Sequence, residues 1–426
     1  MTIVVFLAAL IGAVALGIPI AYSLLLSGVA LMVHLGNFDS QILAQNVIDG
    51  ANSFPLLAVP FFMLAGEIMN VGGLSRRIVD LALKLVGHVR GGLGYVTIIA
   101  ACLMASLSGS AVADTAALTA LLLPMMVRAG HQKARSGGLI ASAGIIAPII
   151  PPSIPFVIFG VTANVSIGKL FLAGIVPGMM MGIAIAAAWW LSARSEAVKT
   201  PPRANRAETL KALRESAWAM VLPVIVLVGL KFGIFTPTEA AVVAAVYALF
   251  VATVIYRELR LDQLYDVFVG AAKTTSIIMF MVAAAAVSAW LIAVANLPAQ
   301  LIELLQPFLN SPTLLLLMLM SVLLLVGMVM DLTPTILILA PVMVPVVKAA
   351  GIDPIYFGVL FVLNGVIGLV TPPVGTVLNV VAGVGRMKID QVAAGVVPFI
   401  IADVVVLGLL VMFPQLVLVP LNFLYR

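Results

Sequence analysis

The stretch Ala147-Pro148-Ile149-Ile150-Pro151-Pro152-Ser153-Ile154-Pro155 places four prolines within eight residues, near the centre of the apolar block 137–163. Proline has no N–H and its ring clashes with the preceding turn, so one regular helix cannot continue through this stretch. A similar break, Leu369-Val370-Thr371-Pro372-Pro373-Val374-Gly375-Thr376, interrupts the block 354–385. Both blocks are therefore predicted to be helices that unwind near their centres and leave backbone carbonyls unpaired.

The composition of the chain is that of a membrane protein. Of its 426 residues, 63% are hydrophobic and 9% are charged, and the mean hydropathy is +1.24, whereas a soluble domain carries roughly 25% charged residues. The apolar blocks approach the ~20 residues that a helix needs to cross the hydrocarbon core, and they lack the alternation of a β-barrel strand. A water-soluble fold is excluded, and an all-α polytopic membrane protein is predicted.

Nine apolar blocks are each predicted to cross the membrane once. They lie at about 3–33, 52–71, 137–163, 168–193, 217–236, 238–256, 270–295, 354–385 and 391–420. The first block has no basic start and no small-residue cleavage site, so it is interpreted as a retained span and not as a secretory signal.

Two further apolar regions, 92–127 and 312–347, are too long for one simple helix and carry polar, helix-breaking residues at their centres. A break at mid-depth is tolerated only where protein or a water-filled cavity covers the backbone. Because each arm is short and the polar residues lie at the tip, both regions are predicted to be re-entrant helical hairpins. A full pair of crossings would leave the topology unchanged and remains the alternative.

Basic residues favour one orientation in the bilayer. They gather in the segments 76–90, 128–135, 194–214, 257–260 and 386–388 and are scarce in the loops between them. Short basic loops are normally cytoplasmic. The count of crossings therefore places the amino terminus in the cytoplasm and the carboxyl terminus in the periplasm of a bacterial inner membrane. This distribution also accounts for the net charge of +5 without a nucleic-acid partner.

The chain contains an internal repeat. Asp114 precedes Pro124 by ten residues, as Asp331 precedes Pro341. In both halves the second proline of the paired prolines is followed by another proline 25 residues later. Five predicted crossings separate corresponding spans, and an odd number turns the second copy over relative to the bilayer. Inverted repeats with interrupted helices are typical of secondary transporters.

The repeat divides the chain into five predicted parts. These are an N-terminal scaffold span (1–45), the first repeat (46–193), a cytoplasmic linker with scaffold spans (194–263), the inverted second repeat (264–420) and a C-terminal end (421–426).

The tip of the first hairpin is a candidate binding site. Ser106, Ser108 and Ser110 place three hydroxyl groups around Gly109, whose conformational freedom lets the backbone turn and expose carbonyls. Opposed helix ends at such a tip offer N–H groups to an anion and C=O groups to a cation. The alternative is that these small residues only let helices pack closely.

Acidic residues inside apolar blocks are costly and are therefore candidate functional residues. Asp114 and Asp331 occupy equivalent positions beside the two tips, and Thr333 and Thr335 add hydroxyl groups at the second tip. Each acid could bind a cation or stabilise a helix start. The sequence leaves both roles open.

The remaining ionisable residues are expected outside the site. Glu67, Glu239 and Asp403 lie nearer the predicted ends of spans and Lys273 lies at the start of one, so an interfacial position or an internal ion pair is expected for each. Cys102 is expected to be a small buried hydrophobe. The sequence has no phosphate-binding Gly-x-x-x-x-Gly-Lys loop, metal-ligand cluster or catalytic triad, so an enzyme is not expected.

Four motifs, in order along the chain, resemble those of the large permease subunit of TRAP (tripartite ATP-independent periplasmic) transporters, the DctM type. They are Ser106-Leu-Ser-Gly-Ser-Ala-Val-Ala-Asp-Thr-Ala, Ala147-Pro-Ile-Ile-Pro-Pro-Ser-Ile-Pro, Met330-Asp-Leu-Thr-Pro-Thr and Thr371-Pro-Pro-Val-Gly. The likeness covers essentially the whole chain, and within the family it is similar to permeases of sugar-acid systems such as diketogulonate transport.

The resemblance implies a function and a set of partners. It implies Na⁺-coupled uptake of a small carboxylate delivered by a periplasmic binding protein, with Na⁺ as the only ion and no other cofactor. It also implies a small membrane subunit of about four spans, expected here as a separate chain. The two hairpins and unwound helices would move as a body against a scaffold, in an elevator mechanism.

The resemblance also assigns the sites. Na⁺ would be bound by Ser106, Ser108, Gly109, Ser110, Ala147, Pro152, Asp331, Thr333, Thr335, Gly368, Thr371 and Pro373. The substrate would lie between the tips, at Ser108, Ser110, Asp114, Ser153, Thr335, Gly375, Thr376 and Asn379. The identity of the carboxylate is not encoded in these groups. A stand-alone anion transporter without a binding protein is the runner-up, and a channel or structural subunit is a third possibility.

Overall fold

The computed structural model of the protein describes residues 2–194, 198 and 200–425. In this part of the chain every regular element is a helix and there is no strand. Eight of the described helices are long and apolar enough to cross a membrane. The prediction of an all-α, multi-pass membrane protein is therefore confirmed. Residues 195–197 and 199 of the predicted linker, and the last residue of the predicted C-terminal end, lie outside the described residues.

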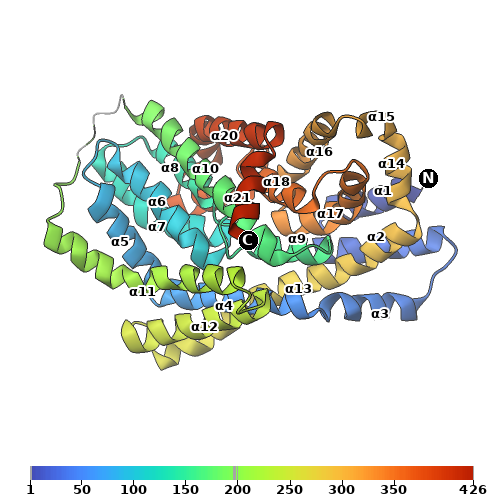
Figure 1. Ribbon diagram of the computed structural model, residues 1–426, viewed down its shortest axis with the longest axis horizontal. Helices are drawn as coiled ribbons and strands as arrows, with labels where there is room; N and C mark the ends of the chain where they lie inside the picture. The colour runs from blue at the N-terminus through green and yellow to red at the C-terminus, as the bar shows by residue number, and fades with distance from the viewer. Residues whose placement is uncertain (1, 195–197, 199, 426) are drawn as a thin grey trace.

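The helices follow one another along an elongated molecule (Figure 1). They are α1 (Thr2–Ala15), α2 (Ile20–His34), α3 (Ser40–Ala51), the 3₁₀ turn η1 (Phe54–Leu57), α4 (Ala58–Val71), α5 (Leu74–Val86), α6 (Gly92–Ser108), α7 (Ala111–Ala129), α8 (Lys133–Gly144), α9 (Ile154–Thr162), α10 (Ile167–Ala193), α11 (Arg206–Lys231), α12 (Pro237–Phe250), the π-helical turn η2 (Val251–Ile255), the 3₁₀ turn η3 (Leu261–Gln263), α13 (Leu264–Val294), α14 (Leu297–Leu304), α15 (Gln306–Leu309), α16 (Pro312–Gly327), α17 (Leu332–Ala349), α18 (Pro354–Gly368), α19 (Thr376–Gly385), α20 (Ile389–Met412) and α21 (Gln415–Tyr425).

The first apolar block, 3–33, differs from the predicted single span. It forms two short helices, α1 and α2, that pack against each other. The chain turns between them because Gly17 adopts a φ of +80° and Pro19 immediately precedes α2; glycine permits the left-handed conformation and proline disfavours helix in the residue before it. The prediction of a cytoplasmic amino terminus counted one crossing here. The division into two helices removes that basis for the prediction.

The last apolar block, 391–420, is also divided. It forms α20 and α21, which are separated by Phe413 and Pro414. The boundary predicted at residue 420 falls inside α21. Hydropathy does not reveal this division because the residues on both sides of Pro414 are apolar.

Both predicted helical hairpins are present. Helices α6 and α7 are joined by Gly109 and Ser110, and α16 and α17 are joined by residues 328–331. The first turn is tight because Gly109, with a φ of +60°, ends α6 and Ser110 caps α7. How deeply either hairpin enters a bilayer remains a prediction.

Both predicted unwound helices are present as well. Turns over residues 145–153 separate α8 from α9, and residues 369–375 separate α18 from α19. The Pro151–Pro152 and Pro372–Pro373 peptide bonds are cis. The helices before the breaks are deeply buried: every residue from Ser136 to Gly144 in α8 and from Tyr356 to Gly368 in α18 is buried.

The packing of these elements is reciprocal. Helix α7 of the first hairpin packs on α19 beyond the second break, and α17 of the second hairpin packs on α9 beyond the first break. Helices α8 and α20 pack together, as do α18 and α10. The α8–α20 contact is a backbone contact, because a Cβ on Gly138 would lie 2.2 Å from the carbonyl carbon of Gly395.

A second group of helices lies along one side of the molecule. Helix α13 packs along α2, α3 and α4, and α12 packs on α4; α3, α4, α12 and α13 run along the lower edge in Figure 1. In this layer of α2, α3, α4, α12 and α13, helices α4 and α13 form one wall of the cavity described below.

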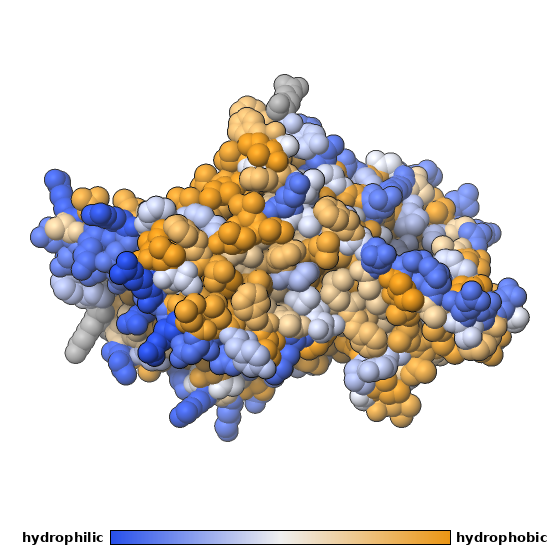
Figure 2. Space-filling model, turned by 90° about the horizontal axis from the view of Figure 1, so that it is seen from below, coloured by the Kyte–Doolittle hydropathy of each residue, from blue (hydrophilic) through white to orange (hydrophobic). Residues whose placement is uncertain are grey.

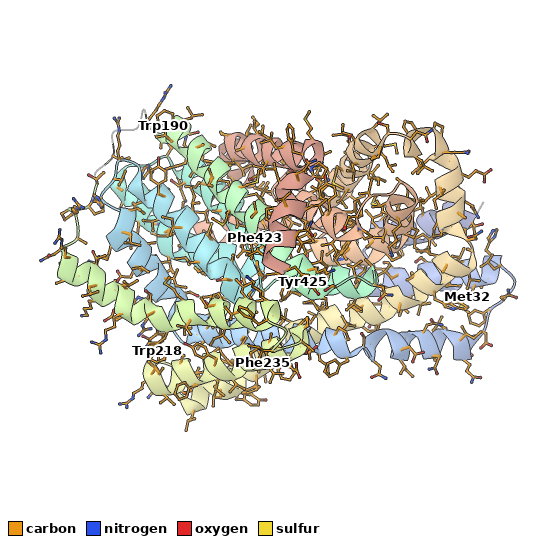
Figure 3. All side chains as sticks on the ribbon, viewed as in Figure 1. Met32, Trp190, Trp218, Phe235, Phe423 and Tyr425 are labelled. Carbon is orange, nitrogen blue, oxygen red and sulfur yellow. The ribbon has the colours of Figure 1, made fainter. Side chains whose placement is uncertain are left out.

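The outer surface is largely apolar. Seen from below, hydrophobic residues cover the middle of the molecule and hydrophilic residues gather toward its two ends (Figure 2). Trp190 and Trp218, which are 56% and 44% exposed, lie at the periphery (Figure 3). Exposed apolar side chains in the middle and polar ones at the ends are the distribution that a surrounding bilayer favours.

We expect Gly138→Ala to destabilise the protein strongly. Its new Cβ would collide with the backbone of α20 and push the helices apart, and overpacking of this kind costs about 1–3 kcal/mol. Thermal unfolding of the purified protein in detergent measures the effect as a fall in midpoint. Gly408→Ala on α20 is the matched control, because a Cβ there meets nothing within 4 Å. Equal midpoints for the two variants would contradict the described packing.

Candidate functional site

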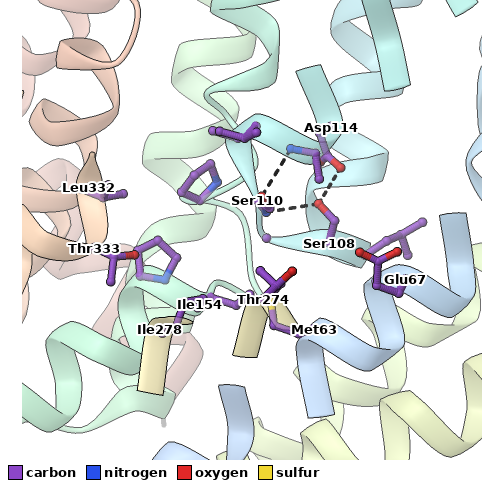
Figure 4. A pocket seen from close by; sticks show the side chains of 18 of the residues that line it. Met63, Glu67, Ser108, Ser110, Asp114, Ile154, Thr274, Ile278, Leu332 and Thr333 are labelled. Carbon is purple, nitrogen blue, oxygen red and sulfur yellow. Dashed lines mark hydrogen bonds between the residues drawn. The ribbon is translucent and has the colours of Figure 1, made fainter. Parts of the chain in front are cut away.

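A cavity of about 430 Å³ lies between the layer of α4 and α13 and the two hairpin tips (Figure 4). The tips contribute residues 107–114 and 331–333 to its lining. The two breaks contribute Pro148 and Leu369, and the start of α9 contributes Ile154 and Pro155. The cavity is therefore the place where both hairpins and both unwound helices meet.

The hydroxyl groups of the first tip are held by a local hydrogen-bond network. Ser110 Oγ accepts a hydrogen bond from the Ala113 N–H (3.3 Å), which caps α7. Ser108 Oγ accepts one from the Ser110 N–H (3.1 Å) and donates to Asp114 Oδ1 (2.5 Å). Asp114 is 3% exposed, and its Oδ2 has no hydrogen-bond partner among the described residues. Asp114 therefore does not cap α7, and its second oxygen is available to a ligand.

The first tip is in direct contact with the first break. A Cβ on Gly109 would lie 2.8 Å from the Pro152 carbonyl oxygen, so only glycine permits this approach. Beyond the break, Ser153 Oγ accepts from the Phe156 N–H (3.3 Å) and donates to the Pro148 carbonyl. The Ser153 hydroxyl thus caps α9 and satisfies one carbonyl that the break leaves unpaired.

The second tip presents a helix start that carries an acid. Asp331 occupies the N-cap position of α17 but makes no side-chain capping hydrogen bond. Its carbonyl accepts from Thr335 Oγ1 (2.7 Å), and Thr335 is fully buried. Asp331 and the neighbouring Thr333 line the cavity. Asp331 therefore contributes to the cavity lining at the start of α17, where its carboxylate is close to the Leu332 N–H.

The second tip also contacts its break. The Gly375 N–H donates to the Met328 carbonyl (3.3 Å), which joins the break to the turn of the hairpin. A Cβ on Gly368 would lie 2.6 Å from the carbonyl carbon of Gly327. Both tips are therefore seated on the breaks through backbone contacts.

The cavity gathers only part of the predicted site. The predicted residues that line it are Ser108, Gly109, Ser110, Asp114, Asp331 and Thr333. Those outside its lining are Ser106, Ala147, Pro152, Ser153, Thr335, Gly368, Thr371, Pro373, Gly375, Thr376 and Asn379.

Several of the residues outside the cavity lining have local hydrogen bonds. Ser106 Oγ donates to the Leu103 carbonyl (2.7 Å), and Thr371 Oγ1 donates to the Ile367 carbonyl (2.7 Å). Asn379 is exposed, and its side-chain N–H donates to the Val374 carbonyl (3.1 Å). These side chains stabilise the helix ends around the breaks.

Four polar residues line the cavity that were not assigned to the site from the sequence. Glu67 and Asn70 come from α4, Ser75 comes from α5 and Thr274 comes from α13. Glu67 was expected at the edge of a span. The sequence could not place it in the cavity, because the position of a residue within an apolar block does not tell which way its side chain points from the helix. The signal available in the sequence was an acid within a block that also holds Gly66.

The expectation for Asp403 was wrong. It is fully buried in α20, where its Oδ2 accepts a hydrogen bond from Ser142 Oγ of α8 (2.6 Å). It is thus neither interfacial nor ion-paired, and it joins the two helices that already meet at Gly138 and Gly395. Glu239 behaves differently, because it completes a capping box with Thr236 at the start of α12.

The charge of the cavity lining is one-sided. Glu67, Asp114 and Asp331 contribute three acidic side chains, and no Lys, Arg or His occurs among the described lining residues. Two helix starts, those of α7 and α17, also meet the cavity, and their N–H groups favour anions. A cavity of this kind can hold an anion only beside a helix start or together with a cation.

The comparison with known protein families identifies the chain. The family described as "Tripartite ATP-independent periplasmic transporter, DctM component" matches residues 7–416. The chain belongs to this family. It is therefore a TRAP transporter permease component, which confirms the resemblance seen in the four motifs.

Individual relatives of this DctM component agree with the family. The 2,3-diketo-L-gulonate TRAP transporter large permease protein YiaN of Escherichia coli is 57% identical over 99% of both chains. The sialic acid TRAP transporter large permease protein SiaM of Vibrio cholerae is 39% identical over 94% of both chains. The crystal structure of the Alcanivorax borkumensis YdaH transporter shares the fold, with a TM-score of 0.66 and 14% identity over 88% of this chain and 87% of that one.

We expect Gly109→Ala to disrupt the first tip. The variant adds a Cβ at a φ of +60° and 2.8 Å from the Pro152 carbonyl oxygen, so the tip must move away from the break. Gly36→Ala is the matched control, because it has a φ of +70° with nothing within 4 Å of a Cβ. Thermal unfolding should show a fall in midpoint for Gly109→Ala that is larger than the backbone cost of about 1 kcal/mol reported by the control. Indistinguishable midpoints would rule out the close contact.

Proposed function

We propose that this DctM component is the large membrane subunit of a Na⁺-coupled TRAP transporter that imports a small carboxylate of the sugar-acid class. The observation that carries the proposal is the cavity between the two hairpin tips, where two helix starts and three acidic side chains meet without a basic residue among the described lining. Translocation, and no chemical conversion of the solute, is the proposed activity.

The charge of the cavity supports cation coupling. An anionic solute entering beside Glu67, Asp114 and Asp331 is repelled unless cations neutralise those groups. Carbonyl oxygens at broken helices and hydroxyl groups are hard donors suited to Na⁺. We place one Na⁺ at the first tip and break, where Gly109 and Pro152 are in contact, and a second at Asp331 and the adjoining break.

The reciprocal packing supports an inverted repeat. Each hairpin packs on the helix beyond the other break, which is the self-complementary pattern that a two-fold operation produces. We propose that the halves 46–193 and 264–420 are related by an axis in the membrane plane. The hairpins are then re-entrant from opposite sides, because both tips reach the same interior cavity.

An elevator movement fits the division of the molecule. The hairpins, the broken helices, α10 and α20 would move together, and the layer with α4 and α13 would act as the scaffold. The boundary between them runs through the cavity, where Gly66 of α4 faces the first tip: a Cβ on Gly66 would lie 3.5 Å from the Ser108 Cα. The absence of a side chain at Gly66 leaves room at this boundary, which is suited to sliding.

The partners and orientation are proposed from the family and the charges. The family description and the words "large permease" in the relatives' names support a separate small membrane subunit and a periplasmic binding protein. The basic residues of the 194–214 linker support a cytoplasmic position for it, at a bacterial inner membrane. Lys169, at the opposite end of α10 from that linker, lies 4.5 Å from the ring of Tyr425, which supports a periplasmic carboxyl terminus.

We expect Ser108→Ala and Asp331→Ala each to lower Na⁺-driven uptake at least about 10-fold, because each removes an oxygen donor to a charged ligand. The assay uses proteoliposomes that contain the chain and its small subunit, with the binding protein loaded with the carboxylate that stabilises it. Ser276→Ala, at an exposed position on α13, is the control. Uptake unchanged in both site variants would remove these residues from the Na⁺ sites.

The same assay separates the alternatives. Uptake that needs both Na⁺ and the binding protein supports the proposal. Uptake that proceeds equally well without the binding protein supports a stand-alone anion transporter. Flux that is independent of Na⁺ supports a channel.

We expect Gly66→Leu to stop transport without removing the binding site. A large side chain facing Ser108 would wedge the first tip against α4 and block its movement, at an overpacking cost of about 1–3 kcal/mol. Na⁺-dependent thermal stabilisation should persist while uptake is lost. Gly12→Leu, at a position with nothing within 4 Å, controls for the added bulk. Normal uptake by Gly66→Leu would argue against a sliding boundary here.

A further inference from the structure

We infer that Glu67 makes the cavity selective for polyhydroxylated monocarboxylates and rejects solutes that carry a second carboxylate. The inference rests on the proposed transport function and adds the charge class of the solute and the residue that sets it. The observations behind it are the position of Glu67, its lack of partners and the composition of the surrounding wall.

Glu67 lies on the cavity wall formed by α4, which faces the first tip. It follows Gly66, whose Cβ position is 3.5 Å from the Ser108 Cα, and Figure 4 places its side chain next to Ser108. On the other side it packs against α13, where its carboxyl carbon would be 4.0 Å from a Cβ on Gly270. The carboxylate is thus held at the cavity wall by α4 and α13.

No described residue neutralises this carboxylate. Glu67 makes no hydrogen bond or ion pair with the described residues. Lys273, the basic residue next to Thr274 in α13, is exposed and does not line the cavity. The charge of Glu67 is therefore directed to whatever occupies the cavity.

The other two acids differ from Glu67 in this respect. Asp114 accepts a hydrogen bond from Ser108, and both Asp114 and Asp331 belong to hairpin tips where Na⁺ is proposed to bind. Glu67 belongs to α4, outside the hairpins. A monocarboxylate can be balanced by the cations at the tips, but a second carboxylate in the same 430 Å³ meets the unbalanced charge of Glu67. Repulsion between two like charges inside one cavity lowers binding by roughly 10-fold or more.

The same wall favours hydroxyl groups. The Glu67 carboxylate, the Asn70 side-chain carbonyl and the Thr274 hydroxyl can each accept a hydrogen bond from a solute hydroxyl. A site built to bind hydroxyl groups discriminates strongly against solutes that lack them. The solute that fits both the hairpin tips and the wall formed by α4 and α13 is a monoanion with several hydroxyl groups.

Gluconate and glucarate test the inference directly, because they differ only in whether the terminal carbon is a CH₂OH or a carboxylate. Calorimetric titration of the complex of this chain with its small subunit, in nanodiscs with Na⁺, should show gluconate binding at least about 10-fold tighter. Glu67→Gln should lower that ratio by roughly 10-fold, since it removes the charge and keeps the shape. Glu67→Asp, which keeps the charge, should retain the preference.

Glu303→Gln is the matched control, because Glu303 is an exposed acid on α14 that does not line the cavity; its ratio should equal that of the wild type. Equal affinities for gluconate and glucarate in the wild type would overturn the inference, as would an unchanged ratio in Glu67→Gln. If Glu67→Gln fails to fold, the wild-type and Glu67→Asp ratios still decide. Binding of neither solute, or Na⁺-dependent binding without preference, would contradict only the inference, whereas uptake without Na⁺ dependence in the assay above would contradict the proposed function itself.

Discussion

A peptide group in the hydrocarbon core must find its hydrogen-bond partner within the protein, and this constraint determines how the rest of the structure is built. The prolines of residues 148–155 and 372–373 remove donors and leave carbonyls without partners. The structure accommodates them by burying the helices beside the breaks, α8, α9 and α18, almost completely. A binding site formed at the breaks is therefore necessarily in the interior.

The hairpin tips follow from the same constraint. Each tip is seated on a break through the backbone, Gly109 against the Pro152 carbonyl and the Met328 carbonyl against the Gly375 N–H. A hairpin tip and a break can pair with each other's free backbone groups. A regular helix could not do this, because its own backbone groups are already paired. This explains why glycines occur where side chains would hold the segments apart.

The interruptions were readable from the sequence, and the directions of side chains were not. Clustered prolines and the residues around Gly109 predicted both breaks and both hairpins because proline and glycine act locally on the backbone. The same rule applied at Gly17 and Pro19 would have divided the first block, but a continuous apolar run concealed that turn. Glu67 and Asp403 were misplaced because the direction of a helical side chain depends on neighbouring helices, which a single sequence does not specify.

The candidate site was predictable to the extent that it consists of the tips. Ser108, Asp114 and Asp331 line the cavity because the turns that hold them point inward. Thr335 and Thr371 do not, because threonine in a helix readily donates to a carbonyl three or four residues earlier. Polar residue type was therefore a weaker guide than position in the turn.

The contacts between helices are of two kinds: some keep two helices together, and others allow two parts of the protein to move past each other. Helices α8 and α20 meet through backbone at Gly138 and Gly395 and through the buried hydrogen bond from Ser142 to Asp403. Breaking that contact would expose polar groups that have no other partner, so these helices stay together. At Gly66, α4 comes near the first tip without touching it as closely, since even an added Cβ would lie 3.5 Å from the Ser108 Cα, and the cavity opens beside it. A solute bound there touches both parts at once, so its charge bears both on how tightly it is held and on whether the two parts can move past each other.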